Sequence, residues 1–368
     1  MEKPTELSTL PHFYYSPKIL DYSFGPGHPL KPERLRRTIE LLEFYGVTPI
    51  DPGEGSERDL LLCHDPEYVE AVRHLDPANE SAETVEPQRY GFGKGDNPLF
   101  AGMFEASLAY VAATASAARA VRNGANLAFG IGGGLHHAHR NRASGFCIFN
   151  DPAIACQILL EKFDRVAYVD IDVHHGDGVQ FLLYDEPRVL TCSIHEEGRT
   201  LFPGTGNVDE IGAEYTSLNV PLSAYTTGDV WLKAFEFGIL PALERFAPQA
   251  IVLQLGTDTH GLDPLGHIRS DAQHWLGAVR RIKELELPIV AVGGGGYNLE
   301  TVPRMWTAAC LTLGGMEVPE TLPDQFASAW SSPTFFDPPT TLQVGQEYAD
   351  QVIEHLQRRF HPNIPQTA

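Results

Sequence analysis

The chain has 368 residues and is 43% hydrophobic, which is enough to bury a large core in one large α/β domain or two ordinary ones. Acidic residues outnumber basic ones by 48 to 27, so the formal net charge of −21 argues against nucleic-acid binding; it favours cationic ligands, or alternatively serves only solubility. Five widely spaced cysteines without a C-x-x-C pair argue against a disulfide framework and a zinc ribbon.

Targeting and membrane signals are absent from the sequence pattern. Residues 1–10 carry three charges and lack the apolar core of a secretion signal. No run of ~18 apolar residues occurs, so a membrane-spanning helix is not expected. We therefore expect a cytoplasmic protein of one domain that binds neither membranes nor nucleic acid.

Helical spacing alternates with short apolar runs along the chain. Helices are predicted over residues 32–45, 104–122, 152–163, 230–245, 271–285 and 346–359, and strands over 127–131, 166–172, 189–194, 250–256 and 288–293. Asn150 or Asp151 is expected to cap the third of these helices, and Ser270 the fifth. This alternation predicts a mostly parallel sheet covered by helices, with ligands bound beyond the carboxyl ends of its strands.

The densest polar cluster directly follows the strand predicted at 166–172. Because side chains alternate along an extended chain, Asp170, Asp172 and His174 are expected on one side of it. Two carboxylates and an imidazole at a strand end form a natural site for a divalent cation such as Zn²⁺ or Fe²⁺. The alternative is a buried, hydrogen-bonded polar cluster without a metal.

A second cluster follows the strand predicted at 127–131, where three glycines precede His136 and His137. Glycine permits tight turns and leaves room for the close approach of a substrate. Either histidine is a candidate general base. The alternative is one packed and one solvated histidine.

The third cluster follows the strand predicted at 250–256 and contains Asp258 and Asp263. A third acidic ligand from this segment would complete an Asp/His/Asp set with an open position, which is the pattern of a catalytic metal site. Both aspartates are candidates on spacing. Asp258 is favoured because it lies nearer the strand end.

The fourth cluster is the glycine run at 293–296, followed by Tyr297. A phenol at this point can donate a hydrogen bond to an oxyanion that develops on a substrate carbonyl. The alternative is a phosphate-binding glycine loop, which is weakened because no Lys-Ser/Thr pair follows.

In this order, each after a strand, the four clusters resemble the histone deacetylase family of the arginase-deacetylase fold, in particular its class I-like and bacterial acetoin-utilisation branches. The resemblance runs from about Tyr14 to about Thr312, and the stretches at 27–34, 64–68, 144–151 and 201–206 support it. It implies one α/β deacetylase domain over residues 1–368, with a mostly parallel sheet of about eight strands flanked by helices. The implied activity is metal-dependent hydrolysis of the acetyl amide of Nε-acetyl-lysine in proteins.

The resemblance also implies roles for individual residues. The metal ligands would be Asp172, His174 and Asp258. The catalytic residues would be a histidine pair, the carboxylates that back it and a carbonyl-polarising tyrosine: His136, His137, Asp170, Asp177 and Tyr297. The substrate channel and its rim would be formed by Asp96, Gly145, Phe146, Phe202 and Leu265. A potassium ion would be held by Asp170, Asp172, His174 and Ser193. Arg34 would line an internal cavity for acetate.

Departures from the family pattern limit what the resemblance implies. Eukaryotic class I enzymes bind inositol phosphate through basic residues, but here only Lys31 matches, while Pro264 and Glu300 occupy two other positions. Inositol phosphate binding and co-repressor recruitment are therefore not expected. Zn²⁺ is the expected metal, and Fe²⁺ suits the same ligands.

Three other functions compete with protein deacetylation. An amidohydrolase of the same fold would act on acetylpolyamines or another small amide. A silent binding module would read acetyl-lysine without cutting it. An arginase-like ureohydrolase would need a two-metal carboxylate cluster, which would leave His136, His137 and Tyr297 without their assigned roles.

Overall fold

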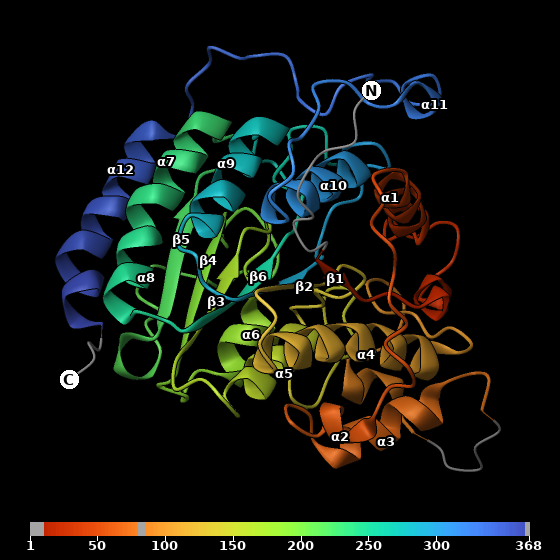
Figure 1. Cartoon of the computed structure of the whole chain (residues 1–368). Helices are drawn as coiled ribbons and strands as arrows, with labels where there is room; N and C mark the ends of the chain where they lie inside the picture. The colour runs from red at the N-terminus through yellow and green to blue at the C-terminus, as the bar shows by residue number, and fades with distance from the viewer. Residues whose placement is uncertain (1–10, 80–84, 365–368) are drawn as a thin grey trace.

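The computed structural model describes residues 11–79 and 85–364, and its centre is an all-parallel sheet (Figure 1). The strand order is β1-β2-β7-β6-β3-β4-β5. The strands are β1 (His12–Phe13), β2 (Leu127–Gly130), β3 (Val166–Asp170), β4 (Val189–Glu196), β5 (Ser217–Leu222), β6 (Ala250–Gln254) and β7 (Ile289–Val292). The predicted α/β class is confirmed, with seven strands in the described ranges where about eight were expected.

Two strands were not predicted from the sequence. β1 is only two residues long, and β5 contains Pro221 as well as the polar residues Ser217 and Asn219, which hides its extended pattern. Both lie at edges of the sheet, where proline is tolerated because a strand there has unpaired backbone groups on one side.

Helices cover both faces of the sheet (Figure 1). One layer contains α1 (Glu33–Phe44), α7 (Gly228–Gly238), α9 (Ala272–Lys283), α10 (Thr301–Leu313) and α12 (Gln346–His355), and the other contains α4 (Met103–Arg122), α5 (Asp151–Leu159) and α6 (Asp177–Leu182). The shorter helices are α2 (Glu57–Leu60), α3 (Pro66–Leu75), α8 (Leu240–Phe246) and α11 (Asp324–Ala327). This three-layer arrangement explains why β3, β4 and β6 are buried along their whole length.

Helix boundaries differ from the prediction where local chemistry decides them. The helix predicted at 230–245 is two helices, because Pro241 begins the first turn of α8 and cannot continue the hydrogen bonding of α7. Asn150 caps α5, since its side chain accepts from the Ala153 amide at 3.0 Å. The cap of α9 is Asp271 and not Ser270, because the Asp271 carboxylate accepts from the His274 amide.

The two central strands also end earlier than predicted. β3 ends at Asp170 and β6 at Gln254, two residues before the predicted ends. The chain leaves the sheet because the Asp170 carboxylate accepts from the Asp172 amide at 3.0 Å, which starts a turn. The segment with Asp172 and His174 is therefore a loop and not extended strand.

Helices α9 and α10 anchor the loop that leaves β6. The indole of Trp275 donates to the Gly256 carbonyl at 2.8 Å, and that of Trp306 donates to the Leu255 carbonyl at 2.7 Å. Both indoles are fully buried. The helical layer thereby fixes the backbone immediately before Asp258.

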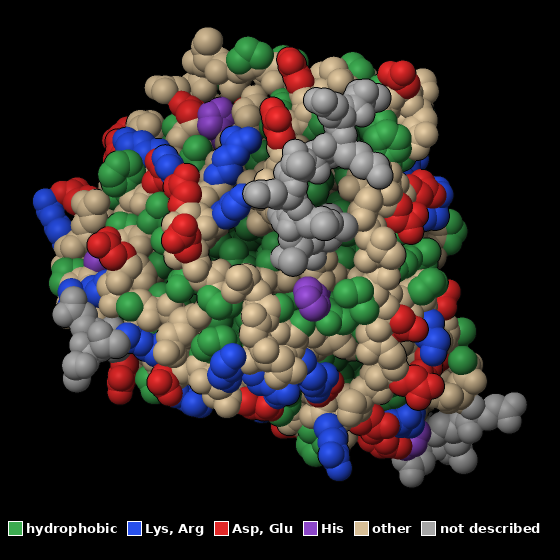
Figure 2. Space-filling view, in the orientation of Figure 1, with side chains coloured by type: hydrophobic (Ala, Val, Ile, Leu, Met, Phe, Trp, Pro, Cys, Tyr) green, Lys and Arg blue, Asp and Glu red, His purple; other side chains and the backbone are tan. Residues whose placement is uncertain are grey.

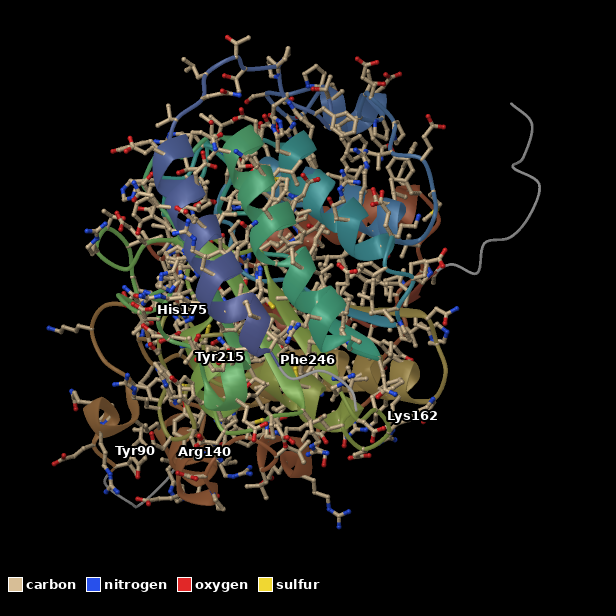
Figure 3. The ribbon with its side chains drawn as sticks, turned by 90° about the vertical axis from the view of Figure 1, so that its left-hand side faces the viewer. Tyr90, Arg140, Lys162, His175, Tyr215 and Phe246 are labelled. Atoms are coloured by element: carbon tan, nitrogen blue, oxygen red, sulfur yellow. The ribbon has the colours of Figure 1, made fainter. Side chains whose placement is uncertain are left out.

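The amino ends and the carboxyl ends of the strands face opposite sides of the molecule. Figure 3 places Lys162, which precedes β3, on one side and His175, which follows β3, on the other. The face seen in Figure 2 lies on the amino-end side, and acidic and basic side chains are interspersed over it. The polar clusters of the sequence therefore lie on the opposite side.

The structure bears on two expectations from the composition, those on the cysteines and on membrane-spanning helices. All five cysteines are free and buried. Within 11–79 and 85–364, no helix has the length and apolar character needed to cross a membrane. Residues 1–10, on which the expectation of no secretion signal rests, lie outside the described residues.

Candidate active site

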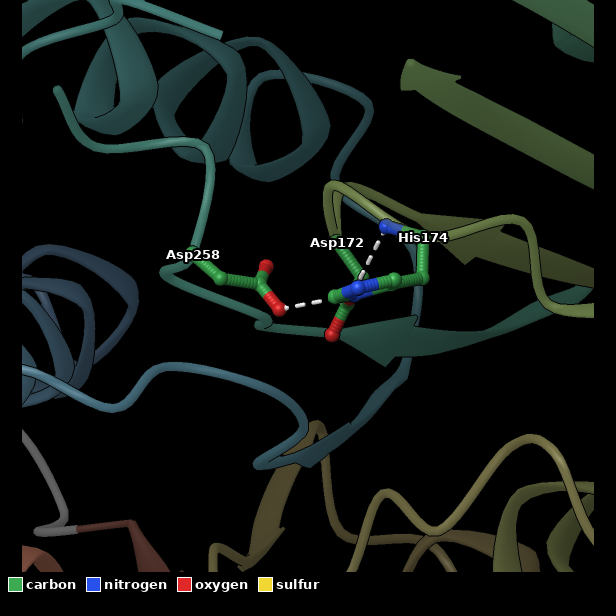
Figure 4. Close-up of side chains that lie close together, drawn as sticks. All are labelled: Asp172, His174 and Asp258. Carbon is green, nitrogen blue, oxygen red and sulfur yellow. Dashed lines mark hydrogen bonds and ion pairs between the residues drawn. The ribbon is translucent and has the colours of Figure 1, made fainter. Parts of the chain in front are cut away.

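Three potential metal ligands meet beyond the ends of β3 and β6. These strands are paired in register, with Asp170 opposite Gln254, so the loops that follow them run side by side. The ligand atoms of Asp172, His174 and Asp258 all lie within 4.8 Å of one another, and all three residues are buried (Figure 4). This is the grouping that both position and resemblance favoured for the third cluster.

The charges of this group fit a divalent cation. Burial raises the pKa of Asp258 to about 7, and the neighbouring charge of Asp172 acts in the same direction. Two buried carboxylates this close are costly without a positive partner. His174 Nδ1 lies 3.2 Å from Asp172 Oδ1 and 3.1 Å from Asp258 Oδ2, which makes an O/N/O donor set suited to Zn²⁺ or Fe²⁺.

Gly295 closes one side of the metal-ligand group. Its amide donates to Asp172 Oδ2 at 2.7 Å. A Cβ at this position would lie 2.0 Å from Asp258 Oδ2 and 2.8 Å from Asp172 Oδ2. Only glycine can bring the Tyr297 loop this close to both carboxylates.

The tandem histidines face each other beside this group, and each is backed by a carboxylate. His136 Nδ1 donates to Asp170 Oδ2 at 2.8 Å, and His137 Nδ1 donates to Asp177 Oδ1 at 2.7 Å. The two Nε2 atoms are 3.0 Å apart. Because each Nδ1 proton points at a carboxylate, only one proton fits between the two Nε2 atoms. The structure thus excludes the alternative of one packed and one solvated histidine.

The two histidines differ electrostatically. Burial alone would lower the pKa of His136, but the charges of Asp170 and Asp172 outweigh it and raise the pKa to about 9. Burial and the charge of His136 lower the pKa of His137 to about 4. The proton between them is therefore held by His136, and His137 Nε2 is the acceptor.

The carboxylates behind the histidines are themselves held in place. Asp170 Oδ2 also accepts from the Tyr168 hydroxyl at 2.6 Å. His139 Nε2 lies 3.4 Å from Asp177 Oδ2. Ser193, predicted as a potassium contact, pairs with Asp170 in the sheet register, and its hydroxyl lies 2.8 Å from His195 Nδ1.

Tyr297 lies on a loop whose backbone is hydrogen-bonded to Arg34. The partly buried guanidinium donates from Nη1 to the carbonyls of Gly294 and Gly296, each at 2.8 Å. It also lies 5.8 Å from the centre of the Tyr297 ring. Burial and the charges of Asp258 and Asp172 raise the pKa of Tyr297 well above its usual value, so the phenol is neutral and can donate.

Asp263 has a different role from the metal ligation that spacing left open. Its Oδ2 accepts from the Tyr297 amide at 2.7 Å, and its Oδ1 accepts from the Leu265 amide at 3.0 Å. The carboxylate therefore joins the tyrosine loop to the predicted channel residue Leu265. The contact to Leu265 is a local aspartate turn that sequence can suggest. The contact to Tyr297, 34 residues away, has no sequence signal.

Two aromatic side chains flank the site, as expected for channel walls. The ring centre of Phe202 lies 5.0 Å from that of His137, and the ring centre of Phe146 lies 5.8 Å from that of Tyr297. Phe146 has a φ of +69°, a strained conformation for a non-glycine residue. Gly145 approaches closely, since a Cβ there would lie 2.5 Å from the His137 ring.

Comparisons with known proteins decide the family. The family model described as "Histone deacetylase domain" matches residues 28–313. The chain belongs to the histone deacetylase family. It is 39% identical to the acetoin utilization protein AcuC of Bacillus subtilis, over 89% of this chain and 91% of that protein. It is 34% identical to histone deacetylase clr6 of Schizosaccharomyces pombe, over 96% and 91%.

Solved structures agree with this assignment. The crystal structure of a histone deacetylase homologue complexed with SAHA superposes with a TM-score of 0.86. The two sequences are 29% identical, and the match covers 94% of this chain and 98% of that chain. The histone deacetylase fold is therefore shown for nearly the whole chain.

In this histone deacetylase family member, Arg34 also lines a small pocket of about 30 Å³. Tyr22, Leu35 and Trp306 complete part of its wall. Arg34 thus joins this pocket to the Tyr297 loop, because its guanidinium bonds the Gly294 carbonyl while the next amide, that of Gly295, bonds the metal-ligand residue Asp172.

Sequence reasoning did not single out the groups that fix the histidine loop of this family member. The buried Asp151 carboxylate accepts from the amides of Gly134 and Leu135 at 2.8 and 2.9 Å. The Asn150 amide group donates to the carbonyls of His136 and Ala138. Both residues were expected only as helix caps. Their second function depends on contacts that chain order does not reveal.

Proposed function

We propose that this protein is a metal-dependent deacetylase that hydrolyses the acetyl amide of Nε-acetyl-lysine in proteins to lysine and acetate. The proposal rests on the way in which three groups of side chains are arranged. The Asp172, His174 and Asp258 group lies beside a carboxylate-backed histidine pair, with Tyr297 on the adjoining loop. Membership of the histone deacetylase family supports the same reaction.

Asp172, His174 and Asp258 would hold the catalytic ion, Zn²⁺ or alternatively Fe²⁺. When bound, such an ion polarises the amide carbonyl and lowers the pKa of water beside it. We also propose a potassium site at Asp170, Asp172, His174 and Ser193, which the pairing of β3 with β4 supports.

The histidine pair would move the protons of the reaction. His137 Nε2, oriented by Asp177, would accept a proton from the water that adds to the amide carbon. It would then deliver a proton to the lysine nitrogen as the carbon–nitrogen bond breaks. His136, held by Asp170, would carry the compensating positive charge beside it. The products are the free amine and acetate.

Tyr297 would stabilise the oxyanion that forms when water adds to the carbonyl. Its hydroxyl makes no hydrogen bond to any residue that the structure describes, so it is free to donate to substrate. Arg34 and Asp263 would hold the tyrosine in position through the loop backbone. A pre-positioned donor of this kind costs no reorganisation during the reaction.

The channel would admit an acyl-lysine stem. Phe146 and Phe202 stand on the two sides of the site and suit an apolar four-carbon chain. Asp96 is exposed and lines a groove together with Gly145 and Phe202, which supports its proposed role in binding the substrate backbone. Leu265 would complete the wall from the loop that Asp263 holds.

A free-standing cytoplasmic enzyme is part of the proposal. Five buried, unpaired cysteines support a reducing compartment. Inositol phosphate is not expected to bind, because the carboxylate of Glu300 accepts from Ser331 at a position where a basic residue would be needed. The net charge of −21 supports the absence of nucleic-acid partners.

The test is turnover of an acetyl-lysine peptide and of acetylspermidine by the metal-loaded protein, with His137→Ala and a hydroxamate inhibitor as controls. We expect acetate release from the peptide, lost in both controls. Turnover of acetylspermidine alone would assign the small-amide alternative. Binding of the peptide without any acetate release would assign the silent binding module.

A further inference from the structure

A surface groove of about 700 Å³ opens beside the active-site mouth. The loop at 88–97 forms one wall, and the turn at 142–145 forms the other. The groove shares Gly145 and Phe202 with the channel, and both residues lie against the His137 ring. A chain segment in the groove would therefore continue directly from an acyl-lysine in the channel.

The charge of this groove is opposite to that of the whole chain. Lys94 and Arg142 line it and are exposed, while Asp96 is its one carboxylate among the residues that the structure describes. Neither cation forms an ion pair within the described ranges, and Arg142 only approaches the His139 ring, with Nη2 3.5 Å from Nε2. Two cations against one carboxylate leave the groove positive on a chain of net charge −21.

Several other exposed arginines are paired with carboxylates, although Arg140, Arg269 and Arg280, like Arg142, form no ion pair within the described ranges. Arg199 pairs with Glu197, and Arg281 pairs with both Glu236 and Glu284. Arg89, in the same 88–97 loop, is paired with Glu67. The mouth thus retains positive charge that its own neighbours do not neutralise.

We propose that this groove selects protein segments in which an aspartate or glutamate lies within a few residues of the acetyl-lysine. The inference rests on the proposed deacetylase function and names its substrate class. Asp96 would bind the backbone of the segment, and Lys94 and Arg142 would pair with the acidic side chain. Basic segments and polyamines are repelled by the same two cations.

The experiment compares three acetyl-lysine peptides of equal length, with Asp, Asn or Lys at the two positions on each side. We expect kcat/KM to be about two- to tenfold higher for the Asp peptide than for the Asn peptide, and lower still for the Lys peptide, as exposed ion pairs allow. The preference should shrink at high salt because the charges are solvent-exposed. Anisotropy titrations of the same peptides on the His137→Ala variant provide a readout independent of turnover.

Charge reversal at the mouth tests the assignment to these residues. Lys94→Glu/Arg142→Glu should invert the order of the three peptides. Lys162→Glu/Arg280→Glu is the matched control, since it makes the same charge change at two exposed cations without an ion pair, in the segments that lead into β3 and β7 at the amino ends of the strands. It should leave the order unchanged.

The outcomes separate the two levels of the proposal. Equal kcat/KM for all three peptides, or a preference that survives the reversal at Lys94 and Arg142, overturns the substrate class while the deacetylase function stands. No acetate release from any peptide overturns the deacetylase function, and the substrate class with it.

Discussion

The floor of the active site and its mouth are built from different kinds of segment: the floor from residues just after strand ends, the mouth mainly from other loops. The floor consists of the metal-ligand group and the histidine pair, which follow β2, β3 and β6 within a few residues of the strand ends. The mouth consists of the loops at 88–97 and 142–145, neither of which directly follows a strand of the sheet, together with Phe202 from the loop after β4. Strand register fixes the floor, whereas loop-to-loop contacts fix the mouth.

This difference indicates which part of the site fixes catalysis and which part can change substrate preference. The floor residues are buried and joined to one another by short hydrogen bonds. The mouth residues Lys94, Asp96 and Arg142 are exposed. We therefore expect changes in the floor to remove turnover and changes in the mouth to shift substrate preference.

The largest effect is expected from Asp258→Asn, which removes one anionic ligand of the floor. Turnover should fall by roughly 10³-fold or more, and bound metal should fall with it. Metal content by atomic absorption and acetate release measure the two effects. Asp209→Asn, at an exposed ion pair with His355, is the control and should change neither. Full metal content and turnover in Asp258→Asn would contradict the assignment.

Tyr297→Phe should lower kcat by ~10²–10³-fold, because one oxyanion donor is lost. Metal content should be unchanged, since the phenol is not a ligand in the proposed site. Steady-state kinetics beside metal analysis separates this variant from Asp258→Asn. A normal kcat would remove Tyr297 from the mechanism.

Asp263→Asn should lower kcat by roughly tenfold, because an amide can accept from only one of the two backbone groups that the carboxylate holds. KM and metal content should change little, since the variant misplaces Tyr297 without touching the ligands. Asp324→Asn, at an exposed carboxylate, is the control. An effect on KM alone would place the role of Asp263 at the mouth and not in the floor.

The smallest effect is expected from Asp96→Asn. Loss of an exposed charge at the mouth should raise KM for peptides by about two- to fivefold and leave kcat nearly unchanged. Peptide kinetics measures both parameters, with the exposed Asp185→Asn as control. A large loss of kcat would show that the mouth and the floor are not separable.

Much of the floor could be predicted from sequence because its residues follow strands. All five predicted strands are found, and parallel strands bring their following loops to one edge. Alternation alone grouped Asp170 with Asp172 and His174, but β3 ends at Asp170, which lies against His136 and not in the metal-ligand group. Asp258 could be separated securely from Asp263 only by resemblance.

The supporting contacts could not be predicted. The bonds from Arg34 to the Tyr297 loop and from Asp263 to Tyr297 join residues far apart in the chain. The mouth was assigned from resemblance alone, and its charge emerged only when the 88–97 and 142–145 segments were seen to share one groove. Such pairings depend on tertiary packing, which local patterns do not encode.

The most direct test of the central claim is acetate release from an acetyl-lysine peptide as Zn²⁺ is titrated into metal-free protein. The account predicts turnover that rises with added metal, reaches a plateau at one ion per chain, and is absent from His137→Ala at the same metal content. Turnover that does not depend on added metal, or that survives in His137→Ala, would contradict the account.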